Sequence, residues 1–351
     1  MKWSKWIRAS VTGVLAFGSV LVGTGRDAVA QNKELNLFCW TEYVPKEVID
    51  GFTKETGIKV NLEEYDSNEQ MLTKLLAGAA KYDLVQPSEY TVEAMVKQNL
   101  LQEIDASKIP NLGNILPEFR GLPHDPENKY TVTWMSGTVG IVVNTEKVTE
   151  PITSFKDVFQ DKYKGRIVAL DDSREIASWA MAMQGLDVNK VDADVLDKIR
   201  PTVEKMVSLI KVYDSTSPKT SLTNGDVDLG VVWSGEAAIL WSENKKFKYV
   251  LPSEGTHRFI DSFAIPKTAA NPDAAHAFIN YILRPEVSVL ISENFPYTNP
   301  NGEARKLLAP EQRDNPASYP PGNPKLDTFR DIGGRATRMI EDMVSEIRSS
   351  N

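Results

Sequence analysis

The segment Trp40-Thr41-Glu42-Tyr43 places two large aromatic rings and a carboxylate directly before a predicted helix. A ring face attracts a cation by ~0.5 to 2 kcal/mol, and the same face packs against methylene groups. This composition suits a cationic, partly apolar ligand. A structural interpretation is equally open, in which Trp40 ends a buried strand, Thr41 or Glu42 caps the helix and Tyr43 packs on it.

The same mixture of acids and rings recurs at four other places. These are Ser88-Glu89-Tyr90, Asp171-Asp172-Ser173-Arg174-Glu175, Trp233-Ser234-Gly235-Glu236 and Phe259-Ile260-Asp261. Structural alternatives exist here too: Asp172 and Glu175 have capping-box spacing, Trp233 suits a core, and Glu236 suits the first turn of a helix. Asp261 is different, because an unpaired acid at the start of a buried strand is costly and a ligand cation explains it better.

The common catalytic motifs are absent from the sequence: no GxGxxG, Walker loop, HExxH or GxSxG is present. His124, His257 and His276 lie far apart and are expected to be surface or hydrogen-bonded histidines rather than metal ligands. We therefore expect no enzyme activity, cofactor or metal. The alternative is a secreted carbohydrate-active hydrolase, because acids lie beside aromatics at several predicted strand ends.

Short apolar runs alternate with helical patterns along the chain, which predicts an α/β fold with largely parallel strands. The strands are predicted at residues 35–40, 58–63, 83–87, 166–170, 228–233 and 261–266, and the helices at 45–56, 67–78, from 173, 195–211, 271–283 and 334–348. Residues 296–324 are rich in Pro and Asn and are predicted as loop. Because loops at the carboxyl ends of strands form the ligand crevice in such sheets, we expect the site at Trp40, Pro87, Asp171 and Trp233.

The N-terminus has the pattern of a secretory signal. Lys2, Lys5 and Arg8 precede an apolar run that is too short to cross a ~30 Å hydrocarbon core, and Ala28-Val29-Ala30 suits cleavage before Gln31. Residues 1–30 are therefore predicted to be a signal peptide. We expect a periplasmic protein without stable membrane insertion.

The length, the net charge and the cysteine count limit the number of domains, the kinds of partner and the disulfides that the protein can have. The chain has 351 residues, 41% of them hydrophobic, which suggests about two domains. Its formal net charge of -8 argues against a nucleic-acid partner. A single cysteine, Cys39, excludes an intrachain disulfide.

Seven segments in order carry a resemblance to a known family. They are Trp40-Thr41-Glu42-Tyr43-Val44-Pro45, Phe52-Thr53-Lys54-Glu55-Thr56-Gly57-Ile58-Lys59-Val60, Tyr82-Asp83-Leu84-Val85 with Pro87-Ser88, Asp171-Asp172-Ser173-Arg174-Glu175, Asp261-Ser262 with Ala264-Ile265-Pro266, Leu283-Arg284-Pro285 and Ala304-Arg305-Lys306-Leu307-Leu308. In these segments the chain resembles the spermidine/putrescine-binding proteins that deliver polyamines to ABC importers. The resemblance implies a two-lobed type II periplasmic binding protein. Residues 31–138 plus 260–305 would form the first lobe and residues 139–259 plus 306–351 the second, each a mostly parallel sheet flanked by helices and joined by crossover strands.

The resemblance also implies a ligand-binding site between the lobes. It implies that five rings line a channel for the methylenes of the ligand: Trp40, Tyr43, Tyr90, Trp233 and Tyr297. The hydroxyls of Thr41 and Ser88 would lie at the wall of this channel. The carboxylates of Asp172, Glu175 and Asp261 would bind the ammonium groups. Glu42 and Glu236 resemble acids of putrescine-selective members. Phe259 stands where spermidine binders commonly carry tryptophan, and Phe329 stands near their glutamine. Phe259 together with Glu236 favours putrescine as the ligand, or binding of both polyamines, and does not decide between these two possibilities.

The expected partners follow from the same resemblance. They are a polyamine, putrescine and/or spermidine, and the membrane permease of an ABC importer, with the binding protein itself a monomer. A polyamine carries fixed positive ends separated by methylenes, so matched carboxylates with rings between them would select it by length.

Overall fold

The computed structural model describes residues 33–78 and 81–350, and residues from Lys33 onward form one compact unit. The predicted signal peptide, residues 1–30, lies outside the described residues. The strands are β1 (Glu34–Trp40), β2 (Lys59–Tyr65), β3 (Leu84–Val85), β4 (Thr131–Asn144), β5 (Ile167–Ala169), β6 (Ile210–Tyr213), β7 (Leu229–Trp233), β8 (Phe247–Val250), β9 (Thr256–Ala264) and β10 (Leu326–Asp327). The main helices are α1 (Lys46–Thr56), α2 (Asn68–Ala77), α3 (Glu89–Lys97), α5 (Ser173–Met183), α6 (Ala193–Leu209), α8 (Ser234–Glu243), α9 (Pro272–Ile282), α10 (Pro285–Asn294) and α13 (Gly333–Ser349). Shorter helices are α4 (Phe155–Val158), α7 (Lys219–Thr223), α11 (Gly302–Leu307) and α12 (Pro310–Arg313).

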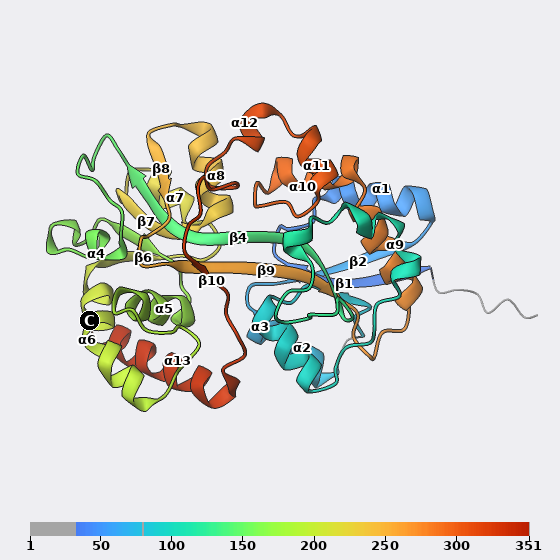
Figure 1. Ribbon diagram of the computed structural model, residues 1–351, viewed down its shortest axis with the longest axis horizontal. Helices are drawn as coiled ribbons and strands as arrows, with labels where there is room; N and C mark the ends of the chain where they lie inside the picture. The colour runs from blue at the N-terminus through green and yellow to red at the C-terminus, as the bar shows by residue number, and fades with distance from the viewer. Residues whose placement is uncertain (1–32, 79–80, 351) are drawn as a thin grey trace, which may run out of the picture. The chain divides into compact units, whose positions relative to one another are not determined.

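The strands form one mixed sheet in the order β2-β1-β3-β9-β4-β7-β5-β6, with β10 beside β9 and β8 beside β4 (Figure 1). Pairing is parallel among β1, β2 and β3 and again among β5, β6 and β7, as the alternation of strands and helices predicts. Parallel pairing does not extend to the centre of the sheet: β4 and β8 pair antiparallel with their neighbours, and β9 pairs antiparallel with β3 and β4 but parallel with β10. These three strands are not separated by simple strand-helix-strand units, so local pattern does not set their direction.

Local sequence chemistry sets several of the helix ends. Gly57 ends α1 in the left-handed conformation, with φ of 70°, which glycine adopts without strain. Ser67 begins α2 by accepting the N–H of Gln70 at 3.1 Å. Asp172 begins α5 in the same way, accepting the N–H groups of Arg174 and Glu175.

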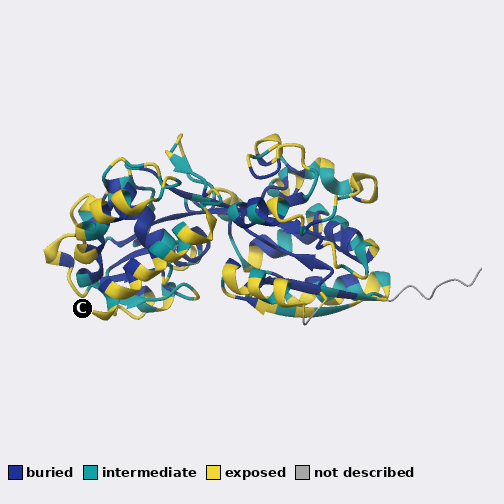
Figure 2. Cartoon of the chain, turned by 90° about the horizontal axis from the view of Figure 1, so that it is seen from below, coloured by how far each residue is buried: buried dark blue, intermediate teal, exposed yellow. Residues whose placement is uncertain are grey.

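The hydrophobic residues are buried in separate clusters that share strand β4. Val132 and Met135 of β4 pack with β1, α1 and α9, whereas Val139 and Ile141 of the same strand pack with α5, α6 and α13. Every residue of β4 is buried, and Figure 2 shows buried strands between helices with exposed outer faces. Strand β4 is therefore the shared framework of both clusters.

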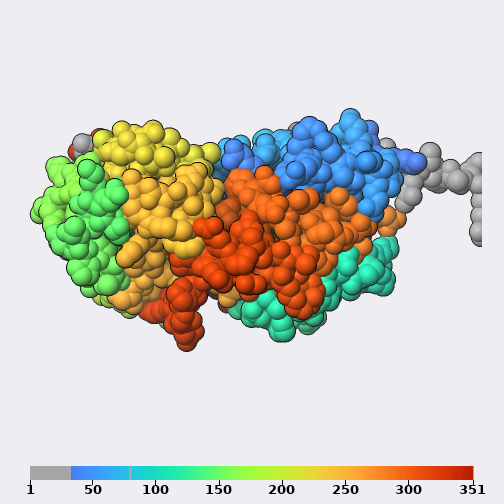
Figure 3. All heavy atoms as spheres, turned by 90° about the horizontal axis from the view of Figure 1, so that it is seen from above, coloured from blue at the N-terminus to red at the C-terminus, as the bar shows by residue number. Residues whose placement is uncertain are grey.

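Two other predictions about elements need correction. Residues 296–324 are not simply loop, because α11 and α12 lie there, with α11 packed against α10 at the top of Figure 1 and the segment forming part of the surface in Figure 3. Strand β9 begins at Thr256, so Asp261 lies within a strand and not at its start.

The helix predicted over 271–283 begins one residue later, at Pro272. Asn271 precedes α9 but makes no side-chain cap; its side-chain amide and its backbone N–H both donate to the buried carboxylate of Asp83. Asp83 also accepts the backbone N–H of Asn36 at 2.9 Å, so it ties β1 to the start of α9. Within residues 33–78 and 81–350, no helix is long and apolar enough to span a bilayer.

Candidate functional site

A single cavity of about 180 Å³ collects the carboxyl ends of several strands and the starts of the helices that follow them. All of the residues predicted for the site line this cavity; they are Trp40, Thr41, Glu42, Tyr43, Ser88, Tyr90, Asp172, Glu175, Trp233, Glu236, Phe259, Asp261 and Tyr297. They come from the loop after β1, the start of α3, the start of α5, the end of β7, strand β9 and the loop after α10. Whether each one contacts a ligand remains a prediction.

The aromatic side chains form a continuous row along the cavity. The ring centroids of Trp40 and Tyr43 are 6.2 Å apart, and those of Tyr43 and Tyr297 are 5.7 Å apart. Phe259 then lies 5.4 Å from Tyr297 and 5.6 Å from Trp233. Such a row offers flat apolar faces over a length suited to an extended chain of methylenes.

The first loop serves both structure and cavity. Thr41 donates its hydroxyl to Asp66 at 2.7 Å, so that hydroxyl is already engaged within the protein. Glu42 is exposed at the rim and adopts φ of 65°, and its N–H donates to Glu64. Trp40 packs on Tyr65 at 4.7 Å between centroids while its edge faces the cavity.

Asp261 is a buried carboxylate, and no cation of the described residues lies at hydrogen-bonding distance from it. It is 1% exposed and accepts the hydroxyl of Ser88 at 2.7 Å. Burial raises its pKa to about 7, although the Ser88 hydroxyl acts to lower it. The β4–β9 register shifts between Thr133 and Met135, opposite this position, and such irregularities re-aim side chains beside a site.

Asp172 both caps helix α5 and lines the cavity, the two roles between which the sequence did not decide. It accepts two backbone N–H groups of α5, at 2.9 and 3.0 Å, and its carboxylate also lines the cavity. Burial, followed by the charge of Glu175, raises its pKa to about 7. The reciprocal capping-box bond from Glu175 is not made, because that side chain turns to a histidine instead.

His257 joins two buried glutamates behind the cavity wall. Its Nδ1 lies 2.5 Å from Glu175 Oε1 and its Nε2 lies 2.9 Å from Glu89 Oε1. Burial alone would lower the pKa of His257, but the two carboxylates outweigh it and raise the pKa to about 10. The ring is thus a cation at neutral pH, and it stacks on Phe329 with centroids 3.7 Å apart.

Glu236 is also paired with a cation of the chain. Lys219 Nζ lies 2.8 and 2.9 Å from its two carboxylate oxygens. Burial still raises the pKa of Glu236, because Lys219 offsets only part of the desolvation. The adjacent Gly235 admits the Tyr297 ring, since a Cβ there would lie 2.6 Å from it.

Sequence reasoning missed three charged residues of this region. Arg174 lies 4.4 Å above the Phe329 ring and 5.0 Å from the Tyr90 ring centroid, and it was present in a segment already singled out. His257 shares one face of β9 with Phe259 and Asp261, a period of two that could have revealed it. Lys219 gave no local signal, because only the tertiary structure brings it to Glu236.

The fold is mixed α/β, and the strand ends bring acids and aromatic rings together around one cavity. This arrangement is typical of a binding protein for a small solute. A family model for bacterial extracellular solute-binding proteins matches residues 47–319, and the chain belongs to this family. The predicted α/β fold of type II periplasmic binding proteins is confirmed by its solved neighbours.

Individual relatives are similar over almost the whole chain. The spermidine/putrescine-binding periplasmic protein of Salmonella typhimurium is 36% identical, covering 99% of each chain. The putrescine-binding periplasmic protein PotF of Escherichia coli is 33% identical, covering 93% of this chain and 92% of PotF. A solved structure from Streptococcus pneumoniae, a spermidine/putrescine ABC transporter substrate-binding protein, is 33% identical with a TM-score of 0.78, covering 90% of this chain and 98% of that one.

The buried Asp261 carboxylate predicts a cost in stability that depends on pH. Its pKa of about 7 in the folded protein exceeds the ~3.9 of an unfolded aspartate, so the folded state binds more protons between these values. Stability should therefore fall as pH rises from about 4 to about 7. Asp261→Asn removes this loss, so its melting temperature should exceed that of the unliganded wild type by a margin that grows with pH and levels off above 7.

Melting curves from pH 5 to pH 8 measure this margin. Asp50→Asn, at an exposed position on α1, is the control and should track the wild type. A margin that does not change with pH would contradict the assignment of a raised pKa to Asp261.

Proposed function

We propose that this protein binds a polyamine in the cavity and delivers it to the permease of an ABC importer. The observation that carries the proposal is that two carboxylates of the cavity, the half-buried Asp172 and the buried Asp261, form no ion pair with a cation of the described residues and lie beside a continuous row of rings. The names of its relatives, which are spermidine/putrescine-binding and putrescine-binding periplasmic proteins, support the same ligand class. We propose that it acts as a monomer in the periplasm after cleavage before Gln31.

The binding energy follows from the chemistry of both partners. Each charge-assisted contact contributes ~1.5 to 3 kcal/mol and each buried methylene ~0.8 kcal/mol. Two ends and four methylenes thus supply roughly 6 to 9 kcal/mol before the rings and the cost of association are counted, which is compatible with micromolar binding. An inorganic monovalent cation lacks the apolar spacer and would leave the rings without a partner.

We infer that the protein acts as a binding protein and not as an enzyme. The relatives are named for binding, and none of those named above is a carbohydrate hydrolase, so the hydrolase alternative has no support from them. The raised pKa values of Asp172 and Asp261 are explained by burial next to other acids and need no catalytic role.

Removing one charge or one ring from the cavity tests the ligand class. Asp261→Asn and Trp233→Ala should each weaken binding of putrescine or spermidine by tenfold or more in calorimetric titrations, because each removes a direct contact with the ligand. Far-ultraviolet circular dichroism should show both variants folded. Unchanged affinity in both variants would remove the assignment of the site, and turnover of glycosides in a product assay would favour the hydrolase instead.

Binding should also release protons at neutral pH. An ammonium group stabilises the ionised carboxylate, so ligand binding lowers the pKa of Asp172 and Asp261 from about 7. Affinity should therefore fall several-fold as pH drops from 8 to 6, while the amines of the ligand stay protonated throughout. Titrations at pH 7 in buffers with different ionisation enthalpies measure the released protons, and a binding enthalpy that is the same in every buffer would contradict this expectation.

We further propose that the cavity lies between two lobes, residues 31–138 plus 260–305 and residues 139–259 plus 306–351. Two hydrophobic clusters that share β4 support this division, and Trp233 packs against both of them. A ligand that contacts both lobes favours their closed arrangement through its differential contacts. Small-angle scattering should show a decrease in the radius of gyration when polyamine is added, and superimposable profiles would count against closure.

A further inference from the structure

The cavity wall contains four buried or half-buried carboxylates, and the chain itself neutralises some of them. Asp172, Glu175, Glu236 and Asp261 are these four. The cavity is also lined by four exposed acids, whose charge water screens; they are Glu42, Asp66, Glu69 and Asp171. A ligand cation gains most from a carboxylate that has no counter-charge already. The number of such carboxylates therefore sets the charge that the ligand should carry.

Glu175 is satisfied by groups of the protein. One of its oxygens meets the His257 ring at 2.5 Å and the other accepts the Trp179 indole N–H at 3.3 Å. His257 and Glu175 expose only 4% and 1% of their side chains, so water does not weaken this pair. A ligand ammonium could reach Glu175 only by competing with a cation that is built into strand β9.

The single charge of His257 is shared with Glu89, and Arg174 supplies the second positive charge near these two glutamates. Among the described residues, its guanidinium forms no ion pair; it donates to the carbonyl of Arg330 at 2.8 Å and interacts electrostatically with Glu89, Asp172 and Glu175. His257 pairs directly with Glu89 and Glu175, whereas Arg174 acts on Glu89, Asp172 and Glu175 only from beyond ion-pair distance.

Glu236 has its own counter-charge in Lys219. The ammonium bonds to both carboxylate oxygens, and the carboxylate is 5% exposed. Among residues 33–78 and 81–350, by contrast, no lysine, arginine or histidine forms an ion pair with Asp172 or Asp261. Two of the four buried or half-buried carboxylates are therefore left for a ligand.

We propose that this site prefers a linear diamine to a triamine, and that Lys219 and His257 set this preference by occupying the remaining acids. The inference rests on the proposed polyamine-binding function and adds the ligand's charge to it. A diamine places one ammonium at Asp172 and one at Asp261. The third ammonium of a triamine finds Glu236 and Glu175 already paired, so its desolvation is not repaid.

The test compares putrescine with spermidine by calorimetric titration of the mature chain at one pH and one salt concentration. The wild type should bind putrescine at least tenfold more tightly. Lys219→Met keeps an unbranched side chain but frees Glu236, so the ratio should shift toward spermidine by at least tenfold. Lys219→Met combined with Glu236→Gln removes both charges and should restore the wild-type ratio.

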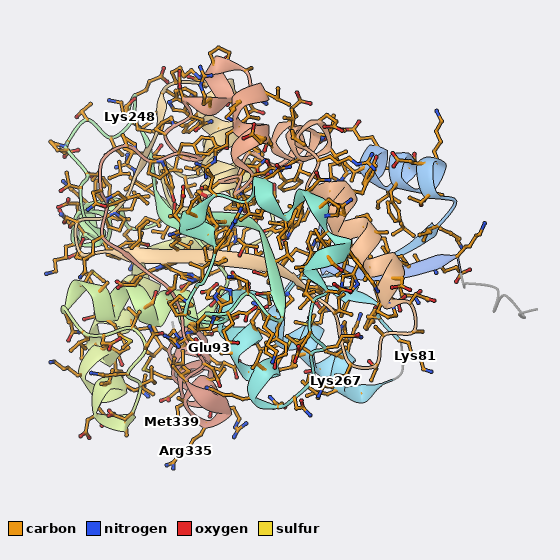
Figure 4. The ribbon with its side chains drawn as sticks, turned by 45° about the vertical axis from the view of Figure 1, so that its right-hand side comes forward. Lys81, Glu93, Lys248, Lys267, Arg335 and Met339 are labelled. Atoms are coloured by element: carbon orange, nitrogen blue, oxygen red, sulfur yellow. The ribbon has the colours of Figure 1, made fainter. Side chains whose placement is uncertain are left out.

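Lys248→Met is the matched control, because Lys248 lies exposed on β8 at the surface (Figure 4). It should leave both affinities unchanged. Spermidine that binds the wild type as tightly as putrescine, or a ratio that does not respond to Lys219→Met, overturns the diamine preference and leaves polyamine binding intact. If the wild type binds neither amine, the proposed function itself is overturned together with this inference.

Discussion

The constraint on which this structure depends is the cost of burying negative charge. A carboxylate taken out of water is costly unless a cation or several hydrogen bonds compensate it, and this cavity gathers several carboxylates in one place. The protein meets the cost in three ways. His257 lies between Glu89 and Glu175 and contacts both. Lys219 forms a salt bridge with Glu236, and Asp172 accepts two backbone N–H groups at the start of α5. The negative charge that these contacts leave uncompensated is available to a bound cation.

The positions of the acids follow from the architecture. Glu89, Glu175 and Glu236 each lie in the first turn of a helix, α3, α5 and α8, where the helix dipole favours negative charge. All three helices follow a strand of the sheet, β3, β5 and β7, within a few residues, so their starts meet at the edge where ligands bind in α/β proteins. The same residues thus serve both helix formation and the cavity, which explains why the structural and functional interpretations of the sequence could not be separated.

Local features were well predicted from the sequence. The strand ending at Trp40 and the helices predicted over 45–56, over 67–78 and from 173 depend on near neighbours in the chain, such as the Asp172 cap, and their chemistry is visible in a few residues. Long-range features were not. The antiparallel direction of β4 and β9 depends on pairing between residues more than a hundred positions apart, for which apolar periodicity carries no direction. The helices α11 and α12, at about one turn each, are too short to show a clear period.

By itself, the sequence determined where the strands end, because apolar runs alternate with helical patterns along the chain. It also determined that acids and aromatic rings recur at those ends. The tertiary structure alone decided which acids remain available. Lys219 reaches Glu236 across 17 positions, and His257 reaches Glu89 across 168. The charge that an acid keeps depends on the cations within a few ångströms of it, and folding brings those cations from distant parts of the chain.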